Sequence, residues 1–187
     1  AAAIVAGLAF LVPLFLASEA GAGASELTFD PPRPVPGDEV RLTYRPTTEL
    51  AGEQKLLVRL HLRQPDSEPP RGALPAHDEV TLLPDGEGRY TGSFRLPPDI
   101  AYMVMAVESP SGDRMDDRDG RLWDLRAHSD DGTPSLGAVR QEFFVLEHRS
   151  WPEAGEALHD MTVLYPERAE GWSRQLLHDG PTQLPDE

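Results

Sequence analysis

The chain has 187 residues, enough for about one domain. Asp and Glu number 32 against 17 Lys and Arg, a formal net charge of −15 at pH 7. This balance argues against binding to nucleic acid or to anionic lipid head groups, because both need clustered basic side chains. No cysteine is present, which excludes a disulfide framework and any cysteine-ligated metal site, so an ordinary hydrophobic core must hold the domain.

The first 24 residues differ in character from the rest. Residues 1–17 read AAAIVAGLAFLVPLFLA without a charged side chain, and residues 20–24 are a spacer of Ala and Gly. A membrane-spanning helix needs about 20 apolar residues, whereas a cleaved signal peptide has an apolar core of about 7–15 followed by a small-residue cleavage site. We expect residues 1–24 to be a transmembrane signal-anchor and spacer. The alternative is a signal peptide cleaved after Ala22-Gly23-Ala24.

Small residues in this segment recur at helical spacing, at Ala2, Ala3, Ala6, Gly7 and Ala9. Small side chains let two membrane helices approach closely, so we expect this stripe to pack against helices of other subunits. The alternative is that alanine is merely frequent in this sequence. A signal-anchor exports the chain that follows it, which predicts a single-pass protein with its main domain on the periplasmic side.

Residues 25–150 contain short runs typical of β-strands, separated by turn sequences such as Pro36-Gly37-Asp38 and Pro84-Asp85-Gly86. Most runs alternate apolar and polar residues, but Tyr102–Val107 and Phe143–Leu146 are apolar on both faces and are predicted to be central strands. The predicted strands are 27–29, 40–44, 58–62, 80–83, 90–96, 102–107 and 143–146. The pattern predicts a mainly β fold, an immunoglobulin- or fibronectin-like β-sandwich.

The period changes in residues 151–187. Apolar residues recur at three- and four-residue steps from Ala154 to Leu164 and again from Ala169 to Leu176, with Pro166 between the two runs. This pattern predicts a short helical hairpin over residues 152–178, followed by a polar tail. Such a pair cannot bury its own apolar faces, so we expect it to dock on the sandwich or on a partner.

Three segments carry a resemblance to a known class: PRPVPGDEVRLTYRPTTELAG, GRYTGSFRLPPDI and, after an Asp-rich turn, ALHDMTVLYPE. Together they cover about residues 40–170 and resemble the immunoglobulin-like N-terminal module of bacterial thioredoxin-like envelope proteins. The resemblance implies a sandwich followed by a helical segment. The chain has no CxxC motif and no thioredoxin domain, so the resemblance implies no redox activity here.

One acidic loop is a candidate calcium site, formed by Asp113, Asp116, Asp117 and Asp119. Ca²⁺ takes 6–8 oxygen ligands, which clustered carboxylates can supply. The loop does not fit an EF-hand, since with Gly120 at the glycine position Met115 and Arg126 would fall where acidic ligands are required. Interleaved arginines make a solvated turn the alternative, and we expect no cofactor.

No catalytic motif is present. The six histidines show no metal-ligand spacing, and neither a nucleophile elbow nor a phosphate-binding glycine loop occurs. Trp123, Trp151 and Trp172 could form a stacking platform for a glycan, or could pack in the core. We therefore expect the protein not to be an enzyme.

These features predict a non-enzymatic, membrane-anchored accessory subunit whose periplasmic sandwich bridges or stabilises a larger membrane protein complex. Its expected partners are the lipid bilayer, through residues 1–17, and other membrane subunits. An anchored acidic sandwich is similar to the extracytoplasmic accessory subunits of some bacterial photosynthetic reaction centre–light-harvesting complexes. The alternative function is an envelope module that binds a glycan or a peptide.

Overall fold

A computed structural model describes residues 24–46, 49–71, 74–118, 120–147, 149–168 and 173. They form eight strands and two helices in chain order: β1 (Glu26–Asp30), β2 (Glu39–Arg45), β3 (Leu56–Arg63), β4 (Asp78–Pro84), β5 (Tyr90–Arg95), β6 (Tyr102–Glu108), β7 (Met115–Asp116), β8 (Trp123–Arg126), α1 (Leu136–Leu146) and α2 (Trp151–Leu164).

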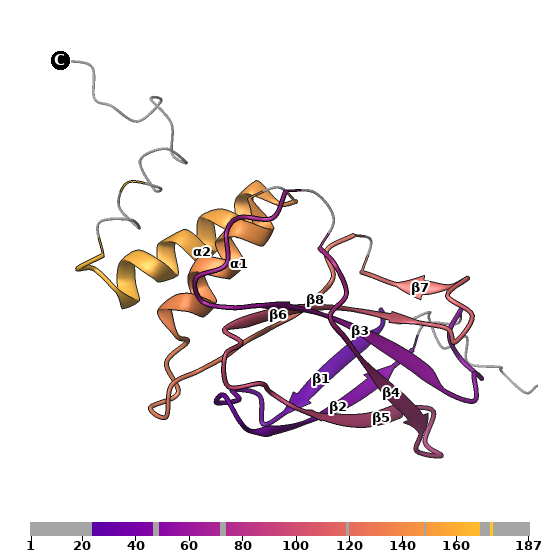
Figure 1. Cartoon of the computed structure of the whole chain (residues 1–187). Helices are drawn as coiled ribbons and strands as arrows, with labels where there is room; N and C mark the ends of the chain where they lie inside the picture. The colour runs from indigo at the N-terminus through magenta and orange to yellow at the C-terminus, as the bar shows by residue number, and fades with distance from the viewer. Residues whose placement is uncertain are drawn as a thin grey trace, which may run out of the picture.

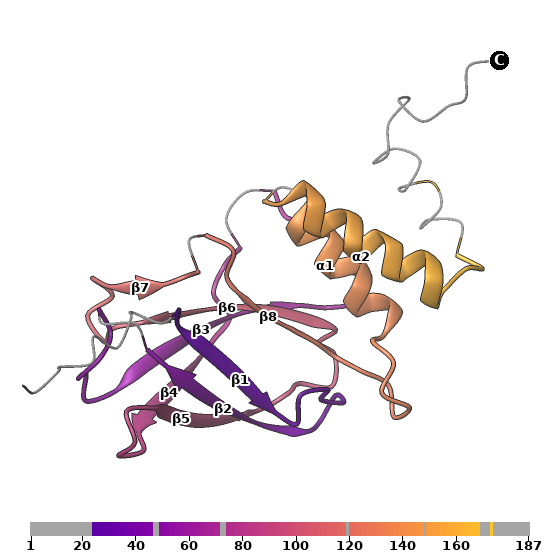
Figure 2. The ribbon, with the colours of Figure 1, turned by 180° about the vertical axis from the view of Figure 1, so that it is seen from behind.

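The strands make one antiparallel sheet that curls back on itself. The strand order is β1-β2-β5-β4-β3-β6-β7, and β8 also pairs with β6. Strand β4 pairs with both β3 and β5, so it connects two halves of the sheet that face each other. Figures 1 and 2 show β1, β2 and β5 in one layer, β3, β6 and β8 in the next, and the two helices beyond β6 and β8.

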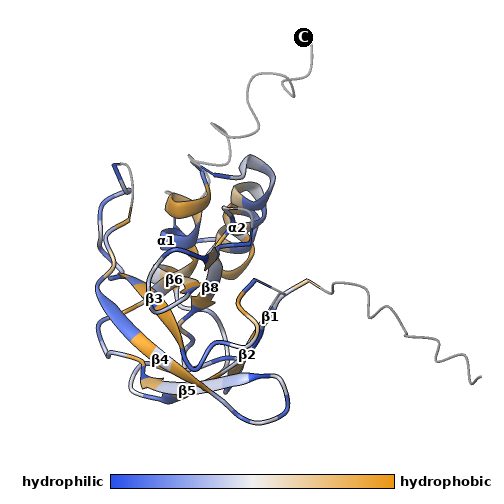
Figure 3. Ribbon diagram, turned by 90° about the vertical axis from the view of Figure 1, so that its right-hand side faces the viewer, coloured by the Kyte–Doolittle hydropathy of each residue, from blue (hydrophilic) through white to orange (hydrophobic). Residues whose placement is uncertain are grey.

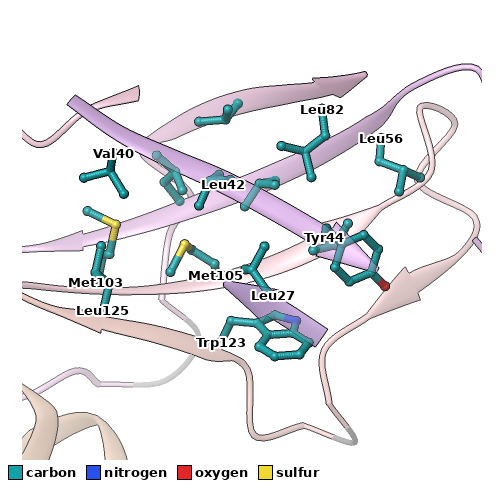
Figure 4. Close-up of a cluster of buried hydrophobic side chains, with 14 of the residues drawn as sticks. Leu27, Val40, Leu42, Tyr44, Leu56, Leu82, Met103, Met105, Trp123 and Leu125 are labelled. Carbon is teal, nitrogen blue, oxygen red and sulfur yellow. The ribbon is translucent and has the colours of Figure 1, made fainter. Parts of the chain in front are cut away.

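The main core lies between the two halves of the sheet. Leu42 and Tyr44 of β2 face Met103 and Met105 of β6, and all four side chains are fully buried (Figure 4). Apolar and hydrophilic residues follow one another along β3 and β4, as the pattern of a half-buried strand requires (Figure 3). The helices cover the opposite face of β6, where Tyr102 and Val104 pack against Val145 of α1.

Glycine at position 92 allows β4 to cross close to β5. A Cβ atom at Gly92 would lie 2.6 Å from the Thr81 carbonyl oxygen and 2.8 Å from Cδ2 of Leu82. Neither distance is compatible with a side chain, so only glycine permits this approach without movement of β4.

Helix α1 packs on β6 and β8, and helix α2 packs on α1 (Figure 1). Ser135 caps α1 by accepting a hydrogen bond from the Ala138 amide. Pro152 stands in the first turn of α2, where its missing N–H costs nothing. A separate apolar cluster joins the helices, with Phe143 and Phe144 of α1 against Ala157 and Leu158 of α2.

The mainly β fold is confirmed, as are the first six predicted strands, which match β1 to β6 within a few residues. Strand β6 is buried on both faces, as its sequence indicated. The predicted strand at Phe143–Leu146 is wrong, because these residues are the last turn of α1. Strand β8 was not predicted, since Trp123–Arg126 has only four residues beside an acidic loop.

A helical hairpin exists, but it begins earlier in the chain than predicted. Its second helix, α2, covers the first predicted helix, and its first helix is α1, inside the range assigned to the sandwich. Of the second predicted helix, only Ser173 is described. The predicted transmembrane segment, residues 1–17, lies outside the described residues. Among those described, neither helix combines the length and the apolar character needed to cross a bilayer.

Candidate functional site

A polar cleft of about 230 Å³ lies between the helix-facing side of β6 and β8, the loop before β8, and the two helices. Its apolar lining residues include Val104, Leu122 and Val145. Its charged and hydroxyl-bearing lining residues are Tyr102, Arg118, Arg121, Asp124, Arg126, Glu142, Glu153 and Glu156.

Strand register explains why the two sheet strands deliver these side chains to one place. Tyr102 pairs with Arg126 and Val104 pairs with Asp124 across the antiparallel β6–β8 ladder. Because side chains alternate along a strand, all four point to the face that the helices cover, while Trp123 and Leu125 point into the main core.

Arg126 connects the sheet to both helices. Its guanidinium lies 2.6 Å from Oε2 of Glu142 on α1 and donates a hydrogen bond of 2.8 Å to Oδ2 of Asp160 on α2. Burial acts to lower the pKa of Arg126, but its interactions with the two carboxylates outweigh burial and raise the pKa. Arg126 therefore stays charged.

Glu142 is only 6% exposed, and burial raises the pKa of its carboxyl group to about 7. Arg126 opposes this shift, while the charges of Asp124 and Asp160 add to it. The attraction to Arg126 is thus real but smaller than the cost of removing the carboxylate from water. Burial also raises the pKa of Tyr102 well above its usual value, so its hydroxyl stays protonated.

The outer part of the cleft carries Asp124, whose pKa is raised by burial although Arg126 and Arg118 act to lower it. Part of the Asp124 residue is nevertheless exposed to solvent. Arg118 lies 4.7 Å from the centroid of the Trp123 ring, a cation–π contact. Arg121 is 3.9 Å from Glu153 at the start of α2.

The predicted calcium ligands are engaged separately. Asp113 accepts hydrogen bonds from Ser109 and Ser111, which lower its pKa to about 2. Asp116 accepts one from the Tyr44 hydroxyl, and Asp117 accepts one from the Gly120 amide.

Asp119 lies outside the described residues. Among the residues that are described, no three acidic or histidine side chains gather as a metal site. Calcium binding by the whole loop, including Asp119, stays a prediction.

Of the other predicted site residues, some lie outside the described part of the chain and some lie within it. Ala2, Ala3, Ala6, Gly7 and Ala9 lie outside the described residues, as does Trp172. Trp123 is buried and packs edge-on against Tyr44, with 6.4 Å between ring centroids. Trp151 is 52% exposed at the start of α2.

The cleft itself was missed by sequence reasoning. A signal for it existed: Glu142 stands three residues from both Val139 and Val145, so it lies on the apolar face of a helix, where an acid needs a partner. That signal is visible only when residues 136–146 are read as a helix.

No known protein family, curated protein or solved structure matches this chain. The cleft combines charged and apolar lining residues and includes residues of the outermost helix, α2, an arrangement suited to binding a charged group of another molecule.

Proposed function

We propose that the protein is a non-enzymatic, membrane-anchored accessory subunit whose extracytoplasmic domain binds another subunit of a membrane complex through helix α2. The observation that carries the proposal is the exposure of large apolar side chains on this outermost helix. Trp151 is 52% exposed, Val163 61% and Leu164 38%. Of the five exposed large apolar residues in the described part of the chain, these three lie on α2.

The packing order supports this role. Helix α1 is held between the sheet and α2, so α2 is presented by a rigid two-layer support. Aromatic side chains such as Trp151 are enriched at protein contact surfaces. The net charge of −15 favours a partner with a basic surface.

We assign the curled sheet to the immunoglobulin- or fibronectin-like sandwich class. Strands β3, β4 and β5 follow one another, and β6 returns to lie beside β3, which is a Greek-key connection. Such sandwiches serve widely as rigid modules of extracellular and envelope proteins, although a fold alone does not define a function.

We infer the membrane anchor from the apolar sequence of residues 1–17. We propose that it holds the domain beside its partner at the membrane, which raises the effective concentration of the two contact surfaces. The photosynthetic reaction centre–light-harvesting complex stays a prediction for the identity of the assembly.

The test is extraction of the full chain from its native membrane in mild detergent, followed by sizing and mass spectrometry. We expect stoichiometric migration with membrane subunits, with residues 1–17 still attached. The double variant Trp151→Ser/Val163→Ser should dissociate from the complex. Leu83→Ser, which changes an equally exposed residue on β4, should not.

Two results would contradict the proposal. A monomeric protein with a new N-terminus near Ser25 would identify residues 1–24 as a cleaved signal peptide. Retention of the α2 double variant in the complex would show that α2 is not the contact surface.

The second candidate function is a peptide-binding envelope module. It is favoured by β1, which pairs only with β2 among the described strands and so leaves one strand edge for an extended peptide. In that case the extracted protein would be free of membrane subunits, and a bound peptide would protect β1 amides from hydrogen exchange.

A further inference from the structure

We propose that the polar cleft receives a lysine or arginine side chain of the partner subunit. This inference rests on the proposed function and specifies its contact chemistry. The cleft opens beside α2 and is lined by Glu153 and Glu156 from that helix, so a protein docked on α2 can reach it.

Two acidic residues of the cleft make no salt bridge within the described part of the chain. Arg126 is held by Glu142 and Asp160, Arg121 lies near Glu153, and Arg118 covers the Trp123 ring. No cationic group of the described residues lies within salt-bridge distance of the remaining two acids, Asp124 and Glu156. The four acids of the lining also outnumber its three arginines, so the cleft has a small excess of negative charge for a further cation.

The surroundings of the Asp124 carboxylate also favour a bound cation. Its carboxylate is disfavoured by its surroundings even though two arginines lie near enough to act on it, as the raised pKa of the group indicates. A cation placed beside it would offset this cost.

The size and walls of the cleft select the kind of ligand. At about 230 Å³ it is smaller than the roughly 300–1,000 Å³ of typical small-molecule sites, so a single side chain suits it better than a whole metabolite. Val104, Leu122 and Val145 offer apolar surface to the methylene groups of lysine or arginine, and the acids of the lining offer partners to the charged end.

The experiment titrates the full chain, in neutral detergent micelles at low ionic strength, with the peptide acetyl-Gly-Lys-Gly-amide. Amide chemical shifts report where it binds. We expect saturable shifts confined to the cleft, at residues such as Val104, Leu122 and Ala157. The same peptide with norleucine in place of lysine, which keeps the chain length and removes the charge, should produce none.

Two charge-matched double variants locate the interaction. Asp124→Asn/Glu156→Gln should weaken binding by about tenfold or more, because the bound cation loses its acidic partners. Asp130→Asn/Glu49→Gln removes the same charge from exposed sites outside the cleft and should change binding by less than about twofold.

Shifts spread over the acidic surface, equal effects of the two double variants, or equal binding of the norleucine peptide would overturn the inference. None of these results depends on co-migration with membrane subunits. If the peptide does not bind but the protein still migrates with membrane subunits, the cleft is not a cation site and the proposed function stands. If the peptide binds but the protein does not migrate with membrane subunits, the proposed function is rejected and the cation site stands.

Discussion

Glu142 makes the stability of this protein dependent on pH. Its carboxyl pKa is about 7 in the folded protein against an ordinary value of 4.5. Between these values the folded state binds more protons than the unfolded state, so the free energy of unfolding falls as pH rises. The groups that set this behaviour face Glu142 from every neighbouring element: Tyr102 of β6, Asp124 and Arg126 of β8, and Asp160 of α2.

Replacing Glu142 with glutamine should remove this pH dependence. Each pKa unit corresponds to about 1.4 kcal/mol, so we expect the unfolding free energy of Glu142→Gln relative to wild type to rise by about 2–3 kcal/mol from pH 4.5 to pH 8. Urea denaturation of both proteins at several pH values measures this difference in unfolding free energy. A difference between Glu142→Gln and wild type that stays constant over this pH range would contradict the assigned pKa.

Gly92 is the residue on which the close approach of β4 to β5 depends. Gly92→Ala would place a methyl carbon against the Thr81 carbonyl oxygen, so β4 must move or the strands must separate. We expect the variant to lose about 1–3 kcal/mol of unfolding free energy, as overpacked sites do. Ser93 is the next residue of β5 and its side chain is exposed, so Ser93→Ala should lose much less unfolding free energy in the same thermal unfolding measurement. Equal losses would refute the steric argument.

At the scale of elements, the error at Phe143–Leu146 shows what a short apolar run cannot reveal. Four consecutive apolar residues fit a buried strand and a buried helix equally, and only the flanking signals decide. Here the deciding signal is Ser135, which is followed by apolar residues at helical spacing from Leu136 onward. The strand prediction at Tyr102–Val107 was correct because a turn precedes it and it contains residues that favour strands, Tyr102, Val104 and Val107.

The two helix N-caps offer a matched comparison. Ser135 accepts a hydrogen bond from the Ala138 amide of α1, whereas Ser150 occupies the same position in α2 and its side chain makes no cap hydrogen bond. Ser135→Ala should therefore cost about 1 kcal/mol of stability, and Ser150→Ala should cost only a few tenths. Chemical denaturation monitored by far-UV circular dichroism distinguishes them. A larger loss for Ser150→Ala would contradict the capping assignment.

At the scale of the whole molecule, part of the layered arrangement could be predicted from the sequence, whereas the polar cleft could not. A strand apolar on both faces implies a layer on each side, and the helices do cover β6. The cleft could not be predicted, because it requires the β6–β8 register that sets Tyr102 opposite Arg126, and a helix that carries Glu142 to them. Neither follows from local periodicity when β8 has four residues and α1 is read as a strand.

The docking of the helices on the sheet should make the domain unfold as one unit. Arg126 holds both helices to β8, and Gln141 of α1 adds a second connection by accepting a hydrogen bond from Arg63 of β3. In the background Trp151→Phe/Trp172→Phe, Trp123 fluorescence reports the sheet and far-UV circular dichroism reports the helices. We expect the two midpoints of urea denaturation to coincide, as two-state unfolding requires.

Arg126→Met should separate these midpoints. The substitution removes the ion pairs of Arg126 with Glu142 of α1 and Asp160 of α2. Losing the partner of a buried polar group costs about 1–3 kcal/mol, and this cost falls on the contact between helices and sheet. The helix signal should then be lost at lower urea than the Trp123 signal. Arg59→Met is the control, because Arg59 also binds two carboxylates, Glu79 and Glu108, but both lie within the sheet. Coincident midpoints in Arg126→Met would mean that apolar packing alone keeps the helices attached.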